Sequence, residues 1–266
     1  MKIAICTNES KKSQSVVKEL IQKINAQEQL TLDYENPQTV ISVGGDGTLL
    51  KAFHQYKNKS DSIEFVGVHT GHLGFYADWR DFELDELIVS LCTKERMKVS
   101  YPLLEIEVLL NDESKHTYLA LNESTIKSVT TTMVCDLSIS GELFESFRGD
   151  GLAFSTPTGS TAYNKSVGGA VVHPSIPAMQ ITEIASLNNR IFRTLGSPMI
   201  ISENEWASID LKQAESYIVT IDHIVVVRAN IQSIRYKIAD QKIHFASTKH
   251  MHFWNRVRDA FIEEVN

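Results

Sequence analysis

Hydrophobic residues in the first hundred positions follow two spacings. Short apolar runs predict strands at 2–6, 30–34, 39–43 and 63–69. Apolar residues at helical spacing predict helices at 10–27, 49–56 and 82–92. In the first of these helices Val16, Leu20 and Ile24 recur every four residues and fall on one face. The alternation of strands and helices favours an α/β, Rossmann-like domain.

The pattern changes after about residue 99. Apolar and polar residues approach a period of two at 104–108, 137–140, 217–221, 234–238 and 243–245, which predicts strands. Helices are predicted at 177–187 and 253–265, the latter with Trp254, Val257, Phe261 and Ile262 on one face. The second part is therefore expected to be β-rich and to end in an amphipathic helix that docks on the body of the protein.

The length fits this division. A chain of 266 residues with 42% hydrophobic residues can bury a substantial core, in two domains or in one large one. We expect an α/β domain at 1–99, a β-rich domain at 100–250 and a C-terminal segment at 251–266 that packs back on the first domain. No internal repeat or low-complexity linker separates them.

Charge and cysteine content exclude several classes of protein. The formal net charge of −7 is spread along the chain, which gives no basic stripe for nucleic acid. No apolar run approaches the roughly 18 residues of a membrane helix, and the start turns polar too soon for a signal peptide. Cys6, Cys92 and Cys135 lie far apart without metal-site spacing, so we expect free thiols in a cytoplasmic protein.

The first candidate site follows the predicted strand at 39–43. Gly44, Gly45, Asp46, Gly47 and Thr48 form a glycine turn that leads into a helix, where backbone N–H groups favour phosphate. An acid beside phosphate suggests phosphoryl transfer, with the carboxylate facing Mg²⁺ or a hydroxyl proton. A tight turn in which Asp46 caps the next helix is the structural alternative.

Two familiar glycine motifs do not fit this turn. The dinucleotide fingerprint needs a third glycine where the chain has Leu50. A G-x-x-x-x-G-K-[ST] loop occurs nowhere in the sequence. The turn therefore belongs to neither an ordinary Rossmann dehydrogenase nor a P-loop enzyme.

Two polar pairs are further candidates. Asn122 and Glu123 follow an apolar run, and their amide and carboxylate suit a ribose diol or an adenine edge. Solvation at the end of a strand is the alternative. Asp222 and His223 stand between two apolar runs, where an acid and an imidazole could meet a phosphate or form a simple turn between strands.

The most informative stretch is Gly/Ser/Thr-rich and runs from 148 to 174. It combines hydroxyl donors, turn-forming Gly and Pro, the acid Asp150 and the aromatic Tyr163. Apolar residues 152–154 lead into it, which a merely solvated loop does not require. This composition favours a ligand site over a surface loop.

These motifs, taken in order, resemble the NAD kinases, and the match is closest to the short bacterial forms. The resemblance rests on G-G-D-G-T at 44–48, G-V-H-T-G-H-L-G-F at 67–75, N-E at 122–123, G-D-G at 149–151, S-T-P-T-G-S-T-A-Y-N at 155–164, S-x-G-G-x-x-x-H-P at 166–174 and D-H at 222–223. It covers nearly the whole chain. The G-G-D-G element by itself is shared with lipid and sugar kinases.

The resemblance implies an enzyme that transfers a phosphoryl group from ATP, or from polyphosphate, to the 2′-hydroxyl of the adenosine ribose of NAD. It implies an α/β N-terminal domain, a β-rich C-terminal domain and a C-terminal segment that returns to the first. It also implies Mg²⁺ or another divalent cation that arrives with the nucleotide, and a homo-oligomer, often a tetramer. No membrane or nucleic-acid partner is expected.

The resemblance also assigns roles to residues. Asp46 is expected to be the general base, with Gly44, Gly45, Gly47 and Thr48 around the phosphates. The residues expected to bind NAD are Gly45, Gly47, Phe75, Asn122, Glu123, Asp150, Ser155, Thr161, Ala162, Tyr163, Ser166, Ala185 and His223. Ala185, Leu187 and Phe192 are expected to close the site from a neighbouring subunit.

Two other functions stay open at this point. A lipid or sugar kinase could share the Gly-Gly-Asp-Gly turn, but would leave the 155–174 motif unexplained. A non-catalytic NAD(P)-binding regulator would have no use for an acid beside phosphates. The sequence leaves open the choice of ATP or polyphosphate, NAD or NADH, the divalent metal, the oligomer size and allosteric control.

Overall fold

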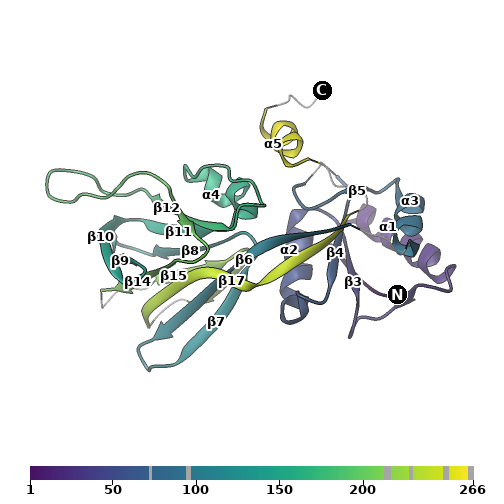
Figure 1. The fold of residues 1–266 in the computed structure, drawn as a ribbon, viewed down its shortest axis with the longest axis horizontal. Helices are drawn as coiled ribbons and strands as arrows, with labels where there is room; N and C mark the ends of the chain where they lie inside the picture. Colours follow the sequence, from purple (N-terminus) through teal and green to yellow (C-terminus); the bar gives the residue numbers. More distant parts are fainter. Residues whose placement is uncertain (72–73, 94–96, 213–216, 228–229, 248–251, 263–266) are drawn as a thin grey trace. The chain divides into compact units, whose positions relative to one another are not determined.

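The protein is described by a computed structural model covering residues 1–71, 74–93, 97–212, 217–227, 230–247 and 252–262. The chain divides into two compact units (Figure 1). The first comprises Met1–Ser100 and Lys242–Asn266, and the second comprises Tyr101–Gln241. The first unit thus contains both ends of the chain, and the strands β6 (Met97–Leu110) and β17 (Ile231–Ser247) cross from one unit to the other.

The first unit is an α/β domain around a parallel sheet. Its strands are β1 (Lys2–Thr7), β2 (Thr31–Leu32), β3 (Thr39–Val43), β4 (Glu64–His69) and β5 (Trp79–Arg80). The order β2-β1-β3-β4 is parallel throughout, and β4 also pairs in parallel with β5 and with the end of β17. All five residues of β3 are buried, as expected of a central strand covered on both faces.

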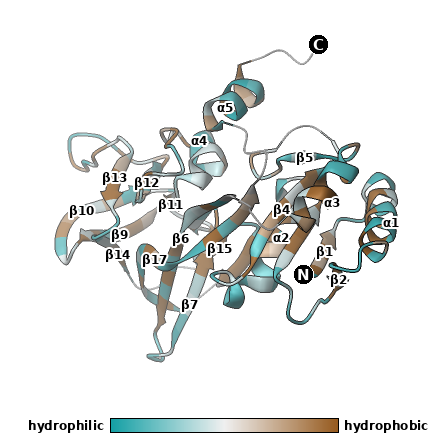
Figure 2. Ribbon diagram, turned by 45° about the vertical axis from the view of Figure 1, so that its right-hand side comes forward, coloured by the Kyte–Doolittle hydropathy of each residue, from teal (hydrophilic) through white to brown (hydrophobic). Residues whose placement is uncertain are grey.

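Helices cover this sheet. They are α1 (Lys11–Asn25), α2 (Asp46–Tyr56) and α3 (Leu84–Cys92), with a short 3₁₀ turn, η1 (Lys57–Lys59), after α2. Helix α1 begins where the Ser10 side chain accepts a hydrogen bond from the N–H of Ser13. The helix then buries Leu20 and Ile24 in a hydrophobic cluster that also holds α3. Figure 2 shows α3 and β4 as predominantly hydrophobic, in keeping with their place in this core.

The second unit contains two antiparallel layers. One is a six-stranded sheet in the order β13-β12-β11-β8-β15-β16. Its strands are β8 (Glu123–Ser128), β11 (Gly151–Ser155), β12 (Ala178–Ile184), β13 (Met199–Ser202), β15 (Tyr217–Ile221) and β16 (Ile224–Val227). The other layer runs β10-β9-β14-β17, with β6 beside β17 and β7 beside β6. Its further strands are β7 (Lys115–Ala120), β9 (Met133–Ile139), β10 (Glu142–Gly149) and β14 (Trp206–Leu211).

One hydrophobic core joins the two layers. Phe154 on β11 stacks on Tyr236 on β17, with ring centroids 3.6 Å apart and planes 6° from parallel. Both side chains are fully buried. The short elements η2 (Thr158–Thr161) and α4 (Tyr163–Ser166) follow β11, and α5 (Phe253–Phe261) ends the described chain.

The predicted fold class is confirmed: an α/β domain precedes a β-rich one, and a C-terminal helix packs on the first. The predicted helix at 177–187 is wrong. Ala178–Ile184 is a strand between β11 and β13, and its first five residues are buried. Met179 and Ile181 alternate with the polar Gln180 and Thr182, as in a strand, but Ala178, Ile181 and Ile184 also recur every three residues, as on a helix. Pairing with β11 and β13 decides for the strand.

Several expected boundaries also shift. The strands expected at 234–238 and 243–245 are parts of one long strand, β17. Helix α2 begins at Asp46 rather than at 49. The last helix ends at Phe261, and the expected residues 263–265 lie outside the described part of the chain, as do residues 72–73 of the glycine-containing stretch. In the described helices, none is long and apolar enough to cross a membrane.

Candidate functional site

The glycine turn at 44–48 joins the carboxyl end of β3 to the first turn of α2. Gly44 has a φ of +154°, and a Cβ there would overlap with the Thr48 hydroxyl, so the position requires glycine. Thr48 itself is buried and accepts a hydrogen bond from the Asn8 amide at 3.4 Å. Gly45 and Gly47 are exposed. The turn therefore presents open backbone at the start of a helix, where anions are favoured.

Asp46 is the first residue of α2 and points to another segment. Its Oδ2 accepts the N–H of Phe75 at 3.0 Å, and its Oδ1 accepts the N–H of Tyr76 at 3.1 Å. A Cβ at Gly74 would overlap with the same carboxylate, so this close approach requires glycine. Helix α2 has no side-chain cap, and the alternative of Asp46 as a helix cap is not what the structure shows. Two backbone amides fix the carboxylate instead.

Phe75 is half-buried beside this carboxylate. Its ring lies near those of Phe253 and Phe261 on α5, with centroid distances of 6.4 and 5.7 Å. A contact between Phe75 and adenine stays a prediction. The structure shows that the residue also joins the C-terminal helix to the segment that holds Asp46.

Asn122 and Glu123 precede and begin β8, and both are buried at 8% and 7% exposure. Solvation at a strand end, the alternative for this pair, does not apply. Their backbone is held from the turn between β15 and β16, where Asp222 has a φ of +52°. The Asp222 carboxylate accepts the N–H groups of Leu121 at 3.0 Å, Asn122 at 2.7 Å and Glu123 at 3.2 Å. The acid predicted near a phosphate is thus the anchor of the 121–123 backbone.

The environment of Glu123 favours its neutral form. Burial, and then the negative charge of Asp222, raise the pKa of Glu123 to about 8, and the N–H of Tyr163 acts in the opposite direction. Among the described residues, Glu123 Oε2 has no hydrogen-bond partner although it is buried. A neutral carboxyl offers both a donor and an acceptor to a ligand hydroxyl.

The hydroxyl groups of the 155–161 motif face the protein backbone. Thr156 Oγ1 donates to the carbonyl of Leu121 at 2.6 Å, and Thr158 Oγ1 donates to the same carbonyl at 3.0 Å. Ser155 is fully buried and donates to the carbonyl of Thr156, while Thr161 donates to that of Thr158. The motif therefore braces the segment that carries Asn122, and ligand contacts by Ser155 and Thr161 stay predictions.

The other predicted residues of this unit lie around α4. Ala162 precedes Tyr163, which begins α4, and Ser166 ends the helix. The Tyr163 hydroxyl accepts a hydrogen bond from Lys127 at 2.6 Å. No motif in the sequence identifies Lys127. It lies four residues after Glu123 on β8, which places both side chains on the same face of the strand.

The remaining predicted residues are exposed, except Phe192, which is half-buried. Asp150, Ala185 and His223 lie at the surface, in loops or turns, and Ala185 has a φ of +47°. Leu187 is 41% exposed, and Arg148 lies over the Phe192 ring at 3.9 Å. Asp46, Thr48 and Phe75 belong to the first unit and the other predicted side chains to the second. The structure brings residues together within each set.

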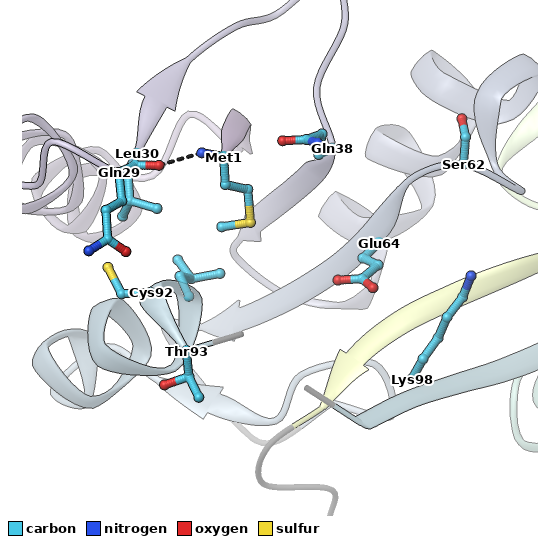
Figure 3. A pocket seen from close by; sticks show the side chains of 10 residues that line it. Met1, Gln29, Leu30, Gln38, Ser62, Glu64, Cys92, Thr93 and Lys98 are labelled. Carbon is cyan, nitrogen blue, oxygen red and sulfur yellow. Dashed lines mark hydrogen bonds between the residues drawn. The ribbon is translucent and has the colours of Figure 1, made fainter. Parts of the chain in front are cut away.

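A hollow of about 440 Å³ occurs elsewhere in the first unit (Figure 3). Met1, Gln38 and Glu64, at the amino ends of β1, β3 and β4, contribute to its lining. The glycine turn lies at the opposite, carboxyl end of β3. Ligands of open parallel sheets bind at the carboxyl ends of the strands, which favours the glycine turn over this hollow.

Metal-binding side chains do not gather in the described part of either unit. In the described ranges, no group of three or more His, Cys, Asp or Glu side chains could hold a metal ion. The three cysteines are free thiols. Burial raises the pKa of Cys6 to about 11 and that of Cys135 to about 12, which makes both thiols unreactive.

Known proteins resemble this chain over its whole length. The family model of the ATP-NAD kinase N-terminal domain matches residues 4–96, and that of the C-terminal domain matches residues 121–240. An NAD kinase of Enterococcus faecalis is 58% identical over 266 residues, covering 99% of this chain and 100% of the relative. An NAD kinase of Lacticaseibacillus paracasei is 55% identical over 231 residues, 87% of each chain.

Two solved structures share the fold. A yeast NADH kinase complexed with NADH has a TM-score of 0.86 at 18% identity, covering 100% of this chain and 89% of its own. An NAD kinase from Archaeoglobus fulgidus in complex with ATP has a TM-score of 0.77 at 22% identity, covering 97% and 99%. The fold, the paired family matches and the close relatives agree. The chain belongs to the ATP-NAD kinase family and is a phosphotransferase.

Proposed function

We propose that the protein transfers the terminal phosphoryl group of ATP to the 2′-hydroxyl of the adenosine ribose of NAD, producing NADP and ADP. The observation that carries this proposal is the Asp46 carboxylate at the glycine turn, held by two backbone amides. The relatives' names and the ATP and NADH complexes of the structural neighbours support the two substrates.

Asp46 is the proposed general base. Each of its carboxylate oxygens accepts one backbone N–H and keeps a further lone pair for the ribose hydroxyl. The 2′-oxygen attacks the terminal phosphorus, the bond from that phosphorus to the bridging oxygen breaks, and ADP leaves. The hydroxyl proton passes to Asp46. Because the transition state is loose, the proton can leave late, and placement matters more than basicity.

The glycine turn is the proposed phosphate site. The open backbone of Gly45 and Gly47 at the start of α2 offers N–H groups to phosphate oxygens, while Gly44 and Thr48 fix the turn. Since the described side chains form no metal cluster, we expect Mg²⁺ to arrive on the nucleotide phosphates, where it offsets their charge. Polyphosphate is the second candidate donor.

NAD is proposed to bind along the second unit. Asn122 and Glu123 would meet the adenosine, and Tyr163 and Asp150 the rest of the dinucleotide. The remaining contacts follow the same proposal: Phe75, Ser155, Thr161, Ala162, Ser166, Ala185 and His223. The buried, unpartnered Oε2 of Glu123 supports a ligand hydroxyl at this point within the described structure.

A homo-oligomer, with the tetramer as the expected size, is part of the proposal. Exposed apolar side chains on the second unit support it: Leu143, Phe144, Leu187, Ile191, Leu195 and Ile200. Ile191 is 82% exposed, and contact with a second copy of the chain would remove such apolar surface from water. Light scattering of the purified protein measures the oligomer size directly. The cytoplasmic location stays a prediction.

Replacement of the proposed base tests the function. Asp46→Asn keeps the size of the side chain, removes its basicity and turns its NH₂ toward one of the two backbone N–H groups that the carboxylate accepts. We expect kcat to fall at least about 100-fold while the Kd for NAD stays within about threefold. The assay supplies NAD, ATP and Mg²⁺ and reads NADP with an NADP-specific dehydrogenase. Asp85→Asn, at an exposed acid on α3, is the control.

Three results would contradict the proposal. Near-normal kcat in Asp46→Asn would show that Asp46 is not the general base. NADP binding without any ATP- or polyphosphate-dependent product from the unmodified protein would indicate a regulator. Phosphorylation of a lipid or sugar in preference to NAD, in a competition among the acceptors, would indicate one of the other kinases with this turn.

A further inference from the structure

The C-terminal helix α5 is bonded to the segment that holds Asp46. Arg256, at the middle of α5, is 4% exposed. Its Nη1 donates to the carbonyls of Gly74 at 3.1 Å and Ala77 at 2.9 Å, and its Nη2 pairs with the Asp78 carboxylate. One planar guanidinium thus binds three acceptors in five residues of chain, an arrangement that a lysine ammonium does not reproduce.

The bonds of Arg256 and Asp46 meet on one peptide group. The carbonyl of Gly74 and the N–H of Phe75 belong to the same planar peptide unit. Arg256 binds that carbonyl, and Asp46 Oδ2 accepts that N–H at 3.0 Å. A peptide plane fixed at its oxygen cannot rotate its N–H away from the carboxylate. A donor at the carbonyl also polarises the amide and strengthens the bond that its N–H makes.

Other contacts hold the same segment to α5. The rings of Phe253 and Phe261 pack against that of Phe75. The Arg256 and Asp78 side chains are 4% and 9% exposed, so their ion pair is shielded from water. Helix α5 therefore contacts residues 74–78, which bind the Asp46 carboxylate. Arg256 and Gly74 are 182 positions apart in the sequence.

We propose that Arg256 is a positioning residue for Asp46, and that through the Gly74–Phe75 peptide the C-terminal helix sets the orientation of the carboxylate in phosphoryl transfer. This inference rests on the proposed function, in which Asp46 receives the ribose proton. The alternative is that Arg256 only docks α5, in which case its loss would lower stability and leave the catalytic step unchanged in the folded enzyme.

The informative substitution is Arg256→Lys, because Arg256→Ala would leave Asp78 buried without its cation and could release the helix. A lysine keeps a positive charge for Asp78 but lacks the fork that reaches the carbonyls. We expect kcat to fall about 10- to 100-fold, as misplacement of a reacting group does, and the KM for NAD to stay within about twofold.

Two controls separate positioning from docking. Asp78→Asn weakens the ion pair and leaves the bond from Arg256 to Gly74, so we expect lower thermal stability with kcat within about threefold. Arg258→Lys changes an exposed arginine of the same helix and should alter neither quantity. A fall in kcat for Asp78→Asn as large as that for Arg256→Lys would overturn the inference, because it would tie the loss of activity to the ion pair rather than to the bond with Gly74. Lower thermal stability with unchanged kcat in Arg256→Lys would also overturn it, in favour of docking.

A double-substitution cycle tests whether Arg256 acts through Asp46. In the Asp46→Asn background, the further change Arg256→Lys should lower the residual kcat less than twofold, because the group it orients has lost its role. The same fold-loss in both backgrounds would overturn the inference. If Asp46→Asn alone leaves kcat unchanged, the proposed function fails; if it removes activity while Arg256→Lys does not, only the inference fails.

Discussion

Asp222 offers the sharpest test of how the second unit holds Asn122 and Glu123. The substitution Asp222→Asn preserves the shape of the side chain, and asparagine tolerates the left-handed backbone that Asp222 adopts at a φ of +52°. The change therefore probes the hydrogen bonds and the charge rather than backbone strain.

The magnitude follows from the three N–H groups that the carboxylate accepts. Oδ2 accepts that of Leu121, and Oδ1 accepts those of Asn122 and Glu123. An asparagine presents one oxygen and one NH₂, so in either orientation at least one backbone N–H faces a donor. The loss of a hydrogen bond to a charged group lowers the free energy of unfolding by about 1.5–3 kcal/mol.

Urea denaturation at pH 7 measures this loss, and calorimetry measures the affinity for NAD. We expect the free energy of unfolding to fall by about 1.5–3 kcal/mol and the Kd for NAD to rise about tenfold, because Asn122 and Glu123 shift. Asp210→Asn, at an exposed acid on β14, is the matched control. Unchanged stability and affinity in Asp222→Asn would refute the view that this carboxylate anchors the 121–123 backbone.

Two further substitutions test the same region. Folding raises the pKa of Glu123 from 4.5 to about 8, so between these pH values the folded protein holds a proton that the unfolded chain has lost. The free energy of unfolding should therefore fall by up to about 5 kcal/mol as the pH rises from 4.5 to 8. Glu123→Gln should flatten this pH dependence in denaturation curves, and an unchanged slope would contradict a neutral Glu123. Thr156→Val removes the hydroxyl that donates to the carbonyl of Leu121 and accepts the N–H of Gly159, so the free energy of unfolding should fall by about 1–3 kcal/mol. Thr132→Val, at an exposed position, should leave it unchanged. Equal losses in the two variants would contradict the proposal that Thr156 braces the backbone at Leu121.

The elements of the first unit were largely readable from local pattern. The strand β3 is a continuous apolar run, and α1 carries its buried residues every four positions after a serine cap. Both signals come from residues close together in the chain. Strand β12 was wrongly predicted as a helix, because its pairing with β11 and β13 depends on distant segments that local pattern does not reveal.

The sequence by itself determined the family, through ordered motifs, and it identified Asp46 and Asn122–Glu123 as candidates. Tertiary structure decided what surrounds them. Asp222 lies 100 residues from Asn122 and Arg256 lies 182 residues from Gly74, yet each is within hydrogen-bond distance of its partner. Periodicity reports which face of an element is buried. Folding alone brings together the chain segments that decide the partner of a polar group. The same segments decide the burial that raises the pKa of Glu123 and the bond from the Thr156 hydroxyl to the backbone.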